Sequence, residues 1–258
     1  MSKLLNCNIF FFIPFMYFFQ TRLKDKNKKL SWFFIYIIPI MIMIFGGREW
    51  VGYDFFSFII YILAIYTSYE MGYIWNDSET IKNEINPTKR LSELELCFYE
   101  EHKLIIYTFR FFILILLYFL IPEHFVFTLM VNVALILLLY FIYNINRNIL
   151  NLPLHFLLVC SRFALPVVAF TSISYFFWII TIFPIINLLE RASEKRFRLN
   201  FFQNFILSDK KRGRYIYYFL LLIICFLCHA PEVIIVATLY MLIYRFSSYE
   251  MKNIRFNK

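Results

Sequence analysis

Acidic and basic residues that could bind a phosphorylated substrate are grouped in a polar segment after a long apolar run. The segment begins at Asn76 and Asp77, passes Glu84 and reaches Lys89 and Arg90. Asp77 and Glu84 would be two turns apart on a continued helix, so their carboxylates would share one face. Such a pair suits Mg²⁺, which takes one or two protein carboxylates together with water and phosphate oxygens. Lys89 and Arg90 could hold the phosphates, and a solvated mixed-charge loop is the alternative interpretation.

A second polar segment, later in the chain, carries a similar mixture of charges. Glu190 and Glu194 are one helical turn apart, and the basic residues Arg191 and Lys195 are interleaved with them. Two glutamates at this spacing with basic neighbours are common on soluble helices, so the pattern alone is weak. Its position gives it weight, because it falls on the same predicted side of the membrane as Asp77. We therefore expect Glu190 and Glu194 to complete the site.

Three charged residues fall inside apolar runs: Glu70, Arg110 and Arg162. Each lies about 10 Å inside the inner boundary of its predicted helix, at about 1.5 Å per residue. Intramembrane charge is costly, so such residues usually face the interior of a helix bundle and mark function. At this shared depth they could pair with one another or line a polar pocket. The aromatic face of Tyr73 could attract a cation by cation–π interaction, although packing between helices is the stronger alternative.

The composition places these residues in a membrane protein. Of the 258 residues, 61% are hydrophobic and 17% are charged, against about 25% charged in an ordinary soluble domain. This excludes a disordered chain, and it leaves too little polar surface to cover a soluble globule. We expect one integral membrane domain over residues 1–258. Residues 1–29 would form an N-terminal hydrophobic segment with a basic stretch, and residues 30–248 the helical core.

Apolar runs predict an all-α, polytopic transmembrane bundle of eight to nine helices, because a spanning helix needs about 20 mostly apolar residues. The eight runs are Leu30–Gly46, Asp54–Asn76, Leu104–Ile121, His124–Tyr143, His155–Thr171, Ser174–Glu190, Tyr215–Ala230 and Pro231–Arg245. A ninth run, Leu4–Phe19, could span the membrane, re-enter it or lie in the interface. Ser92 and Glu95 form a capping-box pattern at the start of a predicted short interfacial helix, Leu91–Lys103.

Basic residues set the predicted orientation. If the stretch 20–30 is cytoplasmic, alternating loops place 22 of the 26 Lys and Arg residues on the cytoplasmic side, as the positive-inside rule requires. This distribution accounts for the net charge of +9 without a nucleic-acid partner. We expect an integral protein of the bacterial inner (plasma) membrane with its active site facing the cytoplasm.

The first polar segment and the helix layout resemble the UbiA superfamily of intramembrane prenyltransferases. That family carries N-D-x-x-D-x-x-x-D after its second helix, followed closely by a proline and basic residues. Asn76 and Asp77 match its opening, Glu84 holds its last acidic position, and Thr80 stands where the middle aspartate is expected. The second family motif, D-x-x-x-D after the sixth helix, is represented by Glu190 and Glu194.

The resemblance implies a Mg²⁺-dependent transferase that moves a prenyl group from an allylic diphosphate to an aromatic or other lipid-compatible acceptor. The expected metal ligands are Asp77, Glu84, Glu190 and Glu194, and Arg162 joins them as a catalytic residue because the family carries an arginine in its fifth helix. The expected substrate-binding residues are Asn76, Lys89, Arg90, Arg191, Lys195, Glu70, Tyr73 and Arg110.

Two alternatives stay open. One branch of the superfamily transfers phosphoribose from its diphosphate to a polyprenyl phosphate, and its motif is similar to the string from Pro87 to Arg90. A non-catalytic transporter or scaffold of the same fold is the other alternative, because fold analogy alone does not fix function.

Overall fold

The computed structural model describes residues 8–46, 52–84, 87–146, 149–194, 197–206 and 209–256. The chain folds into helices, and no β-strand occurs among these residues, as predicted for an all-α protein. The helices form two compact units. Unit 1 contains Met1–Ser31 and Val51–Asn148, and unit 2 contains Trp32–Trp50 and Ile149–Lys258.

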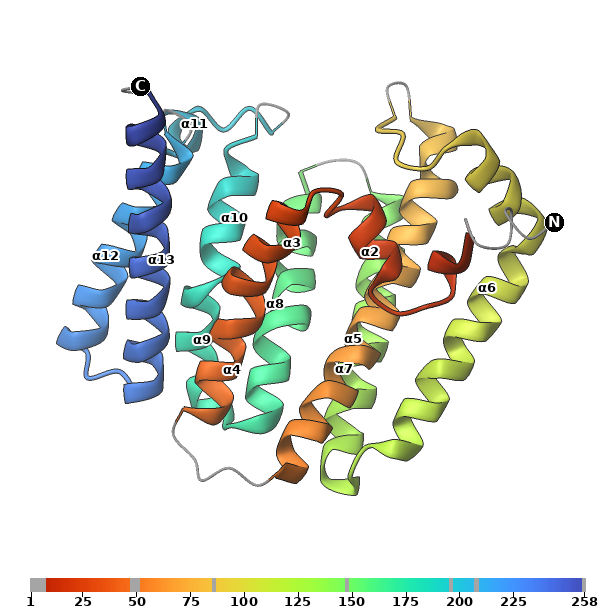
Figure 1. Ribbon diagram of the computed structural model, residues 1–258, viewed down its shortest axis with the longest axis horizontal. Helices are drawn as coiled ribbons and strands as arrows, with labels where there is room; N and C mark the ends of the chain where they lie inside the picture. The colour runs from red at the N-terminus through yellow and green to blue at the C-terminus, as the bar shows by residue number, and fades with distance from the viewer. Residues whose placement is uncertain are drawn as a thin grey trace. The chain divides into compact units, whose positions relative to one another are not determined.

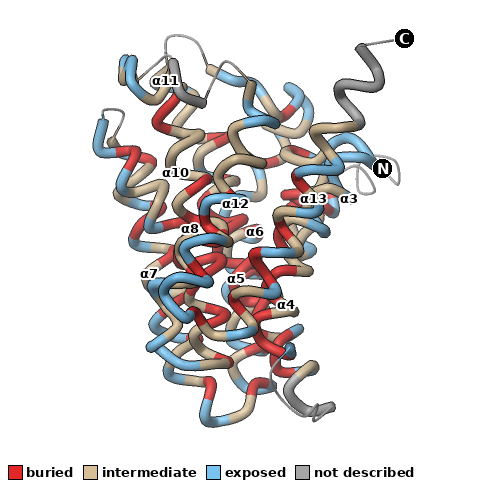
Figure 2. The backbone as a smooth tube through the Cα atoms, turned by 90° about the vertical axis from the view of Figure 1, so that its left-hand side faces the viewer, coloured by how far each residue is buried: buried red, intermediate tan, exposed pale blue. Residues whose placement is uncertain are grey.

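Unit 1 is built around the long helix α5, which packs against α6 and α7 (Figure 1). Its elements are η1 (Ile9–Phe11), α2 (Met16–Thr21), most of α3 (Lys26–Trp32), α5 (Gly52–Ser78), η3 (Thr80–Asn83), α6 (Glu93–Leu120) and α7 (Glu123–Ile145). Of the apolar window of α5, 72% is buried, against 22% for α6 (Figure 2). The central helix α5 therefore positions the buried polar groups of this unit.

Tight packing of α5 against α7 depends on Gly72. A Cβ atom at this position would lie 2.1 Å from the ring of Tyr140. The missing side chain lets the tyrosine lie directly on the backbone of α5, where it also makes an edge-to-face contact with Tyr69 at 4.8 Å between ring centroids. Asn144 donates a hydrogen bond of 3.3 Å to the carbonyl oxygen of Gly72. This part of α5 is therefore fixed against α7 just before the polar segment begins.

Unit 2 contains the remaining helices. They are η2 (Phe33–Ile37), α4 (Ile38–Phe45), α8 (Asn151–Phe170), η4 (Ile173–Tyr175), α9 (Phe176–Ile182), α10 (Pro184–Ala192), α11 (Asn200–Ile206), α12 (Lys210–Leu227) and α13 (Glu232–Phe256). In this unit α12 packs on α13, α10 packs on α8, and α4 contacts both α8 and α13. Pro184 begins α10, where its missing N–H and its ring interrupt the preceding helix, and α9 and α10 meet at a bend of 41°.

Six helices among the described residues are long and apolar enough to cross a membrane, and the bent α9–α10 pair would make a seventh. The six are Lys26–Phe45, Phe55–Lys82, Glu93–Leu120, Glu123–Ile145, Asn151–Phe170 and Glu232–Glu250. These spans characterise an integral membrane protein. The predicted count of eight to nine is not confirmed. The predicted run Tyr215–Ala230 falls on α12, whose first five residues include four basic ones, leaving an apolar stretch shorter than the required 20 residues or so.

The run Leu4–Phe19, for which three placements were left open, is divided in its described part into η1 and α2 on either side of Pro14. The prediction of a separate interfacial helix over Leu91–Lys103 is wrong, since α6 runs unbroken from Glu93 to Leu120 with no glycine or proline to interrupt it. Its capping box is confirmed: Ser92 accepts from the backbone N–H of Glu95, and Glu95 accepts from that of Ser92.

Candidate anion-binding site around Asp77

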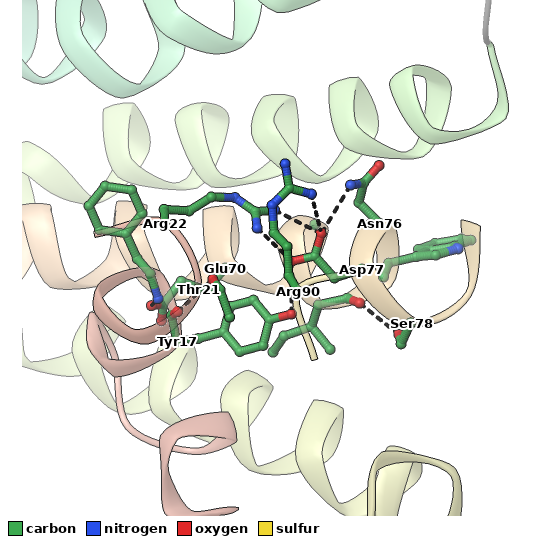
Figure 3. A network of polar contacts seen from close by, with 12 residues as sticks. Tyr17, Thr21, Arg22, Glu70, Asn76, Asp77, Ser78 and Arg90 are labelled. Atoms are coloured by element: carbon green, nitrogen blue, oxygen red, sulfur yellow. Dashed lines mark hydrogen bonds and ion pairs between the residues drawn. The ribbon is translucent and has the colours of Figure 1, made fainter. Parts of the chain in front are cut away.

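The carboxylate of Asp77 is fully buried near the end of α5 and receives hydrogen bonds from four side chains (Figure 3). Its Oδ1 accepts from Nη2 of Arg22 at 2.9 Å, from Nη1 of Arg90 at 3.1 Å and from Nδ2 of Asn76 at 3.2 Å. Its Oδ2 accepts from the hydroxyl of Tyr17 at 3.0 Å and lies 2.7 Å from Nη1 of Arg22. We call Asp77 and these four partners the Asp77 cluster.

The Asp77 cluster carries one negative and two positive charges, so it has an excess of one positive charge. Burial alone would lower the pKa of Arg22, but its hydrogen bond and charge attraction to Asp77 raise that pKa above its ordinary value. Arg22 therefore stays charged. The side chains of Arg22 and Arg90 keep 15% and 30% of their surface exposed, so both are only partly buried. Lys89, next to Arg90, is exposed.

Tyr73 flanks the cluster, one turn before Asp77 on α5. The guanidinium carbon of Arg22 lies 4.3 Å from the centroid of its ring, within the range of a cation–π interaction. The ring also makes edge-to-face contacts with Tyr69 at 5.1 Å and Tyr140 at 5.8 Å. Tyr73 thus contributes to the site by orienting Arg22.

Glu84 does not share a helical face with Asp77, contrary to the expectation of a continued helix. The α-helix ends at Ser78, a short 3₁₀ turn covers Thr80–Asn83, and the backbone of Glu84 is extended with ψ 136°. Side chains such as Ser78 and Thr80 compete for backbone hydrogen bonds and favour helix ends. The hydroxyl of Ser78 donates to the carbonyl oxygen of Ile74 at 2.6 Å. Glu84 is half-buried.

The Asp77 cluster does not fit a bound Mg²⁺ ion. Among the residues that the structure describes, no three His, Cys, Asp or Glu side chains gather in a way that could hold a metal. Both oxygens of Asp77 already accept from protein donors, and two of the donors are guanidinium groups. A divalent cation at this carboxylate would meet two positive charges at close range. In this structure the carboxylate of Asp77 therefore pairs with two arginines, and it is not arranged as a metal ligand.

The second polar segment lies in unit 2, where both glutamates are paired with arginines. Glu190 on α10 forms a bidentate ion pair with Arg214 on α12, with 2.6 Å between Oε2 of Glu190 and Nη2 of Arg214. The hydrogen bond to Glu190 raises the pKa of Arg214. Glu194, beyond the end of α10, binds Arg191 at 2.9 Å. The ion pair between Glu190 and Arg214 therefore links α10 to α12. Lys195, the other predicted residue of this segment, lies outside the described residues.

The intramembrane charges fall in both units. In unit 1 Glu70 and Arg110 are fully buried and form an ion pair of 2.9 Å, so these two residues follow the first of the two alternatives, pairing or lining a polar pocket. In unit 2 Arg162 is buried in α8, its guanidinium carbon 5.1 Å from the ring centroid of Tyr36. The hydroxyl of Tyr36 donates to the carbonyl oxygen of Arg162. These tyrosine contacts fix Arg162 between α8 and η2.

Of the predicted site residues, the structure therefore groups Asn76, Asp77 and Arg90, with Tyr73 beside them. Sequence reasoning missed Tyr17 and Arg22, which lie 60 and 55 residues from Asp77 in the chain. The only signal was that Arg22 is the first charge after the N-terminal apolar run. Comparisons with protein-family models, with curated protein sequences and with solved structures found no significant match in any of the three.

Proposed function

We propose that this protein is an intramembrane transferase that binds the diphosphate of a prenyl diphosphate at the Asp77 cluster. The prenyl group would pass to a lipid-compatible acceptor, at a site that faces the cytoplasm of a bacterial inner membrane. The observation that carries the proposal is the gathering of two guanidinium groups on one buried carboxylate, at the end of a long apolar helix. The motif resemblance around Asn76 and Asp77 supports the same substrate class.

Arginine suits this role because its planar guanidinium group presents five N–H donors in a fixed fork that matches phosphate geometry. Arg90 uses one of its nitrogens and Arg22 two in holding Asp77, so donors remain for phosphate oxygens. Asp77 would keep both guanidinium groups oriented before the substrate binds, which lowers the free-energy cost of ordering these side chains on binding. Lys89 would add charge at the exposed edge.

The proposed reaction breaks the bond between the first prenyl carbon and the diphosphate oxygen, and the electron pair leaves with the diphosphate. Positive groups fixed where negative charge develops lower the barrier to such a step. The nucleophilic atom of the acceptor forms the new bond to that carbon and releases its proton to solvent. Arg22 and Arg90 would thus act on the leaving group.

The predicted Mg²⁺ site remains a proposal that rests on the resemblance alone. Its predicted ligands are Asp77, which is paired with arginines in the structure, and Glu84, Glu190 and Glu194. No step above depends on the metal. Assays with and without Mg²⁺ separate a metal-dependent transferase from one that relies on its arginines.

The test measures pyrophosphate release by the purified protein in nanodiscs that contain membrane lipids as a source of acceptors. Geranylgeranyl diphosphate and phosphoribosyl diphosphate are compared as donors. We expect release from the prenyl donor, and a loss of about 100-fold in kcat/KM for Arg22→Gln and Arg90→Gln, from about 2–3 kcal/mol per charge-assisted contact. Lys28→Gln is the matched control, because this nearby basic residue is exposed and pairs with Asp25.

Other results of the same assay would favour one of the alternative functions. Release from the phosphoribosyl donor alone would reassign the activity to phosphoribosyl transfer. Absence of release from either donor would contradict the transferase and favour a transporter or scaffold.

A further inference from the structure

We infer that the buried ion pair Glu70–Arg110 is a positioning device that holds the N-terminal segment, residues 8–22, so that Tyr17 and Arg22 reach Asp77. The inference rests on the proposed function for its binding readout, and it assigns this segment to the site. It also changes the role of Glu70 and Arg110, which sequence reasoning had placed among the substrate-binding residues.

The N-terminal segment contains a break that leaves backbone groups without helical partners. The 3₁₀ turn η1 ends at Phe11 and α2 begins at Met16. Between them Pro14 has no N–H to donate, and Phe15 has a left-handed backbone with φ 69°. Helix ends leave N–H and C=O groups unbonded, and each such group costs several kcal/mol in apolar surroundings. The segment therefore needs polar partners from elsewhere in the chain.

Glu70 and Arg110 supply those partners on both sides of the break. The carboxylate of Glu70 accepts from the backbone N–H of Phe18 at 2.7 Å and of Phe15 at 3.1 Å, as an N-cap side chain does within one helix. Arg110 donates from Nε to the carbonyl oxygen of Phe11 at 2.7 Å and from Nη1 to Glu70 at 2.9 Å. One ion pair thus binds the end of η1 and the start of α2.

The same contacts set the register between α2 and α5. Figure 3 shows Glu70 and Asp77 of α5 beside Tyr17 and Arg22 of the N-terminal segment. Glu70 and Asp77 are seven residues apart on α5, which is about 10 Å along the helix. Glu70 binds the first turn of α2, and Asp77 binds Arg22, which caps the end of α2. A slip of one residue would move α2 by about 1.5 Å and stretch the 2.9 Å contact between Arg22 and Asp77 beyond hydrogen-bonding distance.

A direct role of Glu70 in binding substrate fits the structure less well. Its side chain and that of Arg110 have no exposed surface. Its two oxygens already accept from Phe15, Phe18 and Arg110. A ligand would have to break those bonds to reach the carboxylate, so the pair acts on the site through the segment that it holds.

The experiment measures two quantities in full-length protein in nanodiscs: hydrogen exchange of the amides in residues 15–22, and the affinity for inorganic pyrophosphate. We expect Glu70→Gln to speed exchange at least 10-fold and to weaken affinity about 10-fold. Glu79→Gln is the matched control just beyond the end of α5, since Glu79 pairs with Lys82 and Tyr99 and should change neither quantity. If Glu70→Gln does not fold, Arg110→Lys replaces it as the test variant, because it keeps the positive charge but loses the planar guanidinium group.

A double mutant separates positioning from a general loss of structure. If Glu70 acts through Arg22, Glu70→Gln should weaken affinity no further in an Arg22→Gln background. A full additional 10-fold loss in that background would overturn the inference, as would unchanged exchange in Glu70→Gln. Faster exchange with unchanged affinity would also overturn it, because the segment would then not serve the site.

Failure of the proposed function gives a different pattern. If the wild type does not bind pyrophosphate, the diphosphate site is refuted. The exchange measurement then still decides whether Glu70 and Arg110 hold the segment.

Discussion

Asp77→Asn is the perturbation whose effect follows most directly from the structure. The change removes the negative charge that neutralises one of two guanidinium groups and leaves both facing an amide in a mostly buried place. Removing one partner of a buried ion pair costs about 3–5 kcal/mol. Arg90 is nearly one-third exposed, so its share is closer to the 0.2–1 kcal/mol or so of a surface pair. We therefore expect a loss of about 3 kcal/mol, mostly from Arg22.

The assay is thermal unfolding of the purified protein in detergent without divalent metal. About 3 kcal/mol corresponds to a fall in Tm of roughly 6–12 °C for a chain of this size. If Asp77 were instead a metal ligand without a protein partner, the metal-free protein would carry an uncompensated buried charge. Asp77→Asn would then remove that charge and would not lower Tm. An unchanged or higher Tm for Asp77→Asn in metal-free buffer would refute the arginine pairing.

Three further predictions concern other parts of the chain. Glu190→Gln should lower the free energy of unfolding by about 1–3 kcal/mol, because it breaks the charge-assisted pair with Arg214; Arg214→Gln should match it, and a double mutant that loses the sum of both would contradict the pairing. Gly72→Ala should cost about 1–3 kcal/mol by overpacking against Tyr140, seen as a lower Tm, and an unchanged Tm would disprove the close approach. Burial raises the pKa of Tyr17 well above 10, so its neutral form stabilises the fold below about pH 10 and that contribution is lost as pH rises further. The stability difference between wild type and Tyr17→Phe, about 1 kcal/mol at pH 7, should therefore narrow above pH 10 in unfolding measurements, and a constant difference up to pH 12 would contradict this.

Local sequence was sufficient for the features that depend on neighbouring residues. The apolar lengths of α5 to α8 predicted their helices, because a helix of about 20 apolar residues carries its own hydrogen bonds. The capping box at Ser92 followed from a spacing of three residues. The shared depth of Glu70 and Arg110 indicated that they could pair, because burying either charge alone would be costly.

The rest depended on contacts between distant parts of the chain. Nothing near Arg22 indicates that it binds Asp77, since the contact forms only when the broken N-terminal segment packs against α5. The partner of Glu190 was missed for the same reason, because Arg214 is 24 residues away on another helix. Glu84 was misplaced by assuming that α5 continues, whereas the polar residues after Asp77 end it.

A structure of the protein in nanodiscs with a bound, non-hydrolysable prenyl thiodiphosphate would test the central proposal most directly. We expect phosphate oxygens within about 3 Å of the guanidinium groups of both Arg22 and Arg90, with Asp77 still bonded to at least one of them. A diphosphate bound away from both arginines, or a metal ion on Asp77 with both arginines displaced, would contradict it.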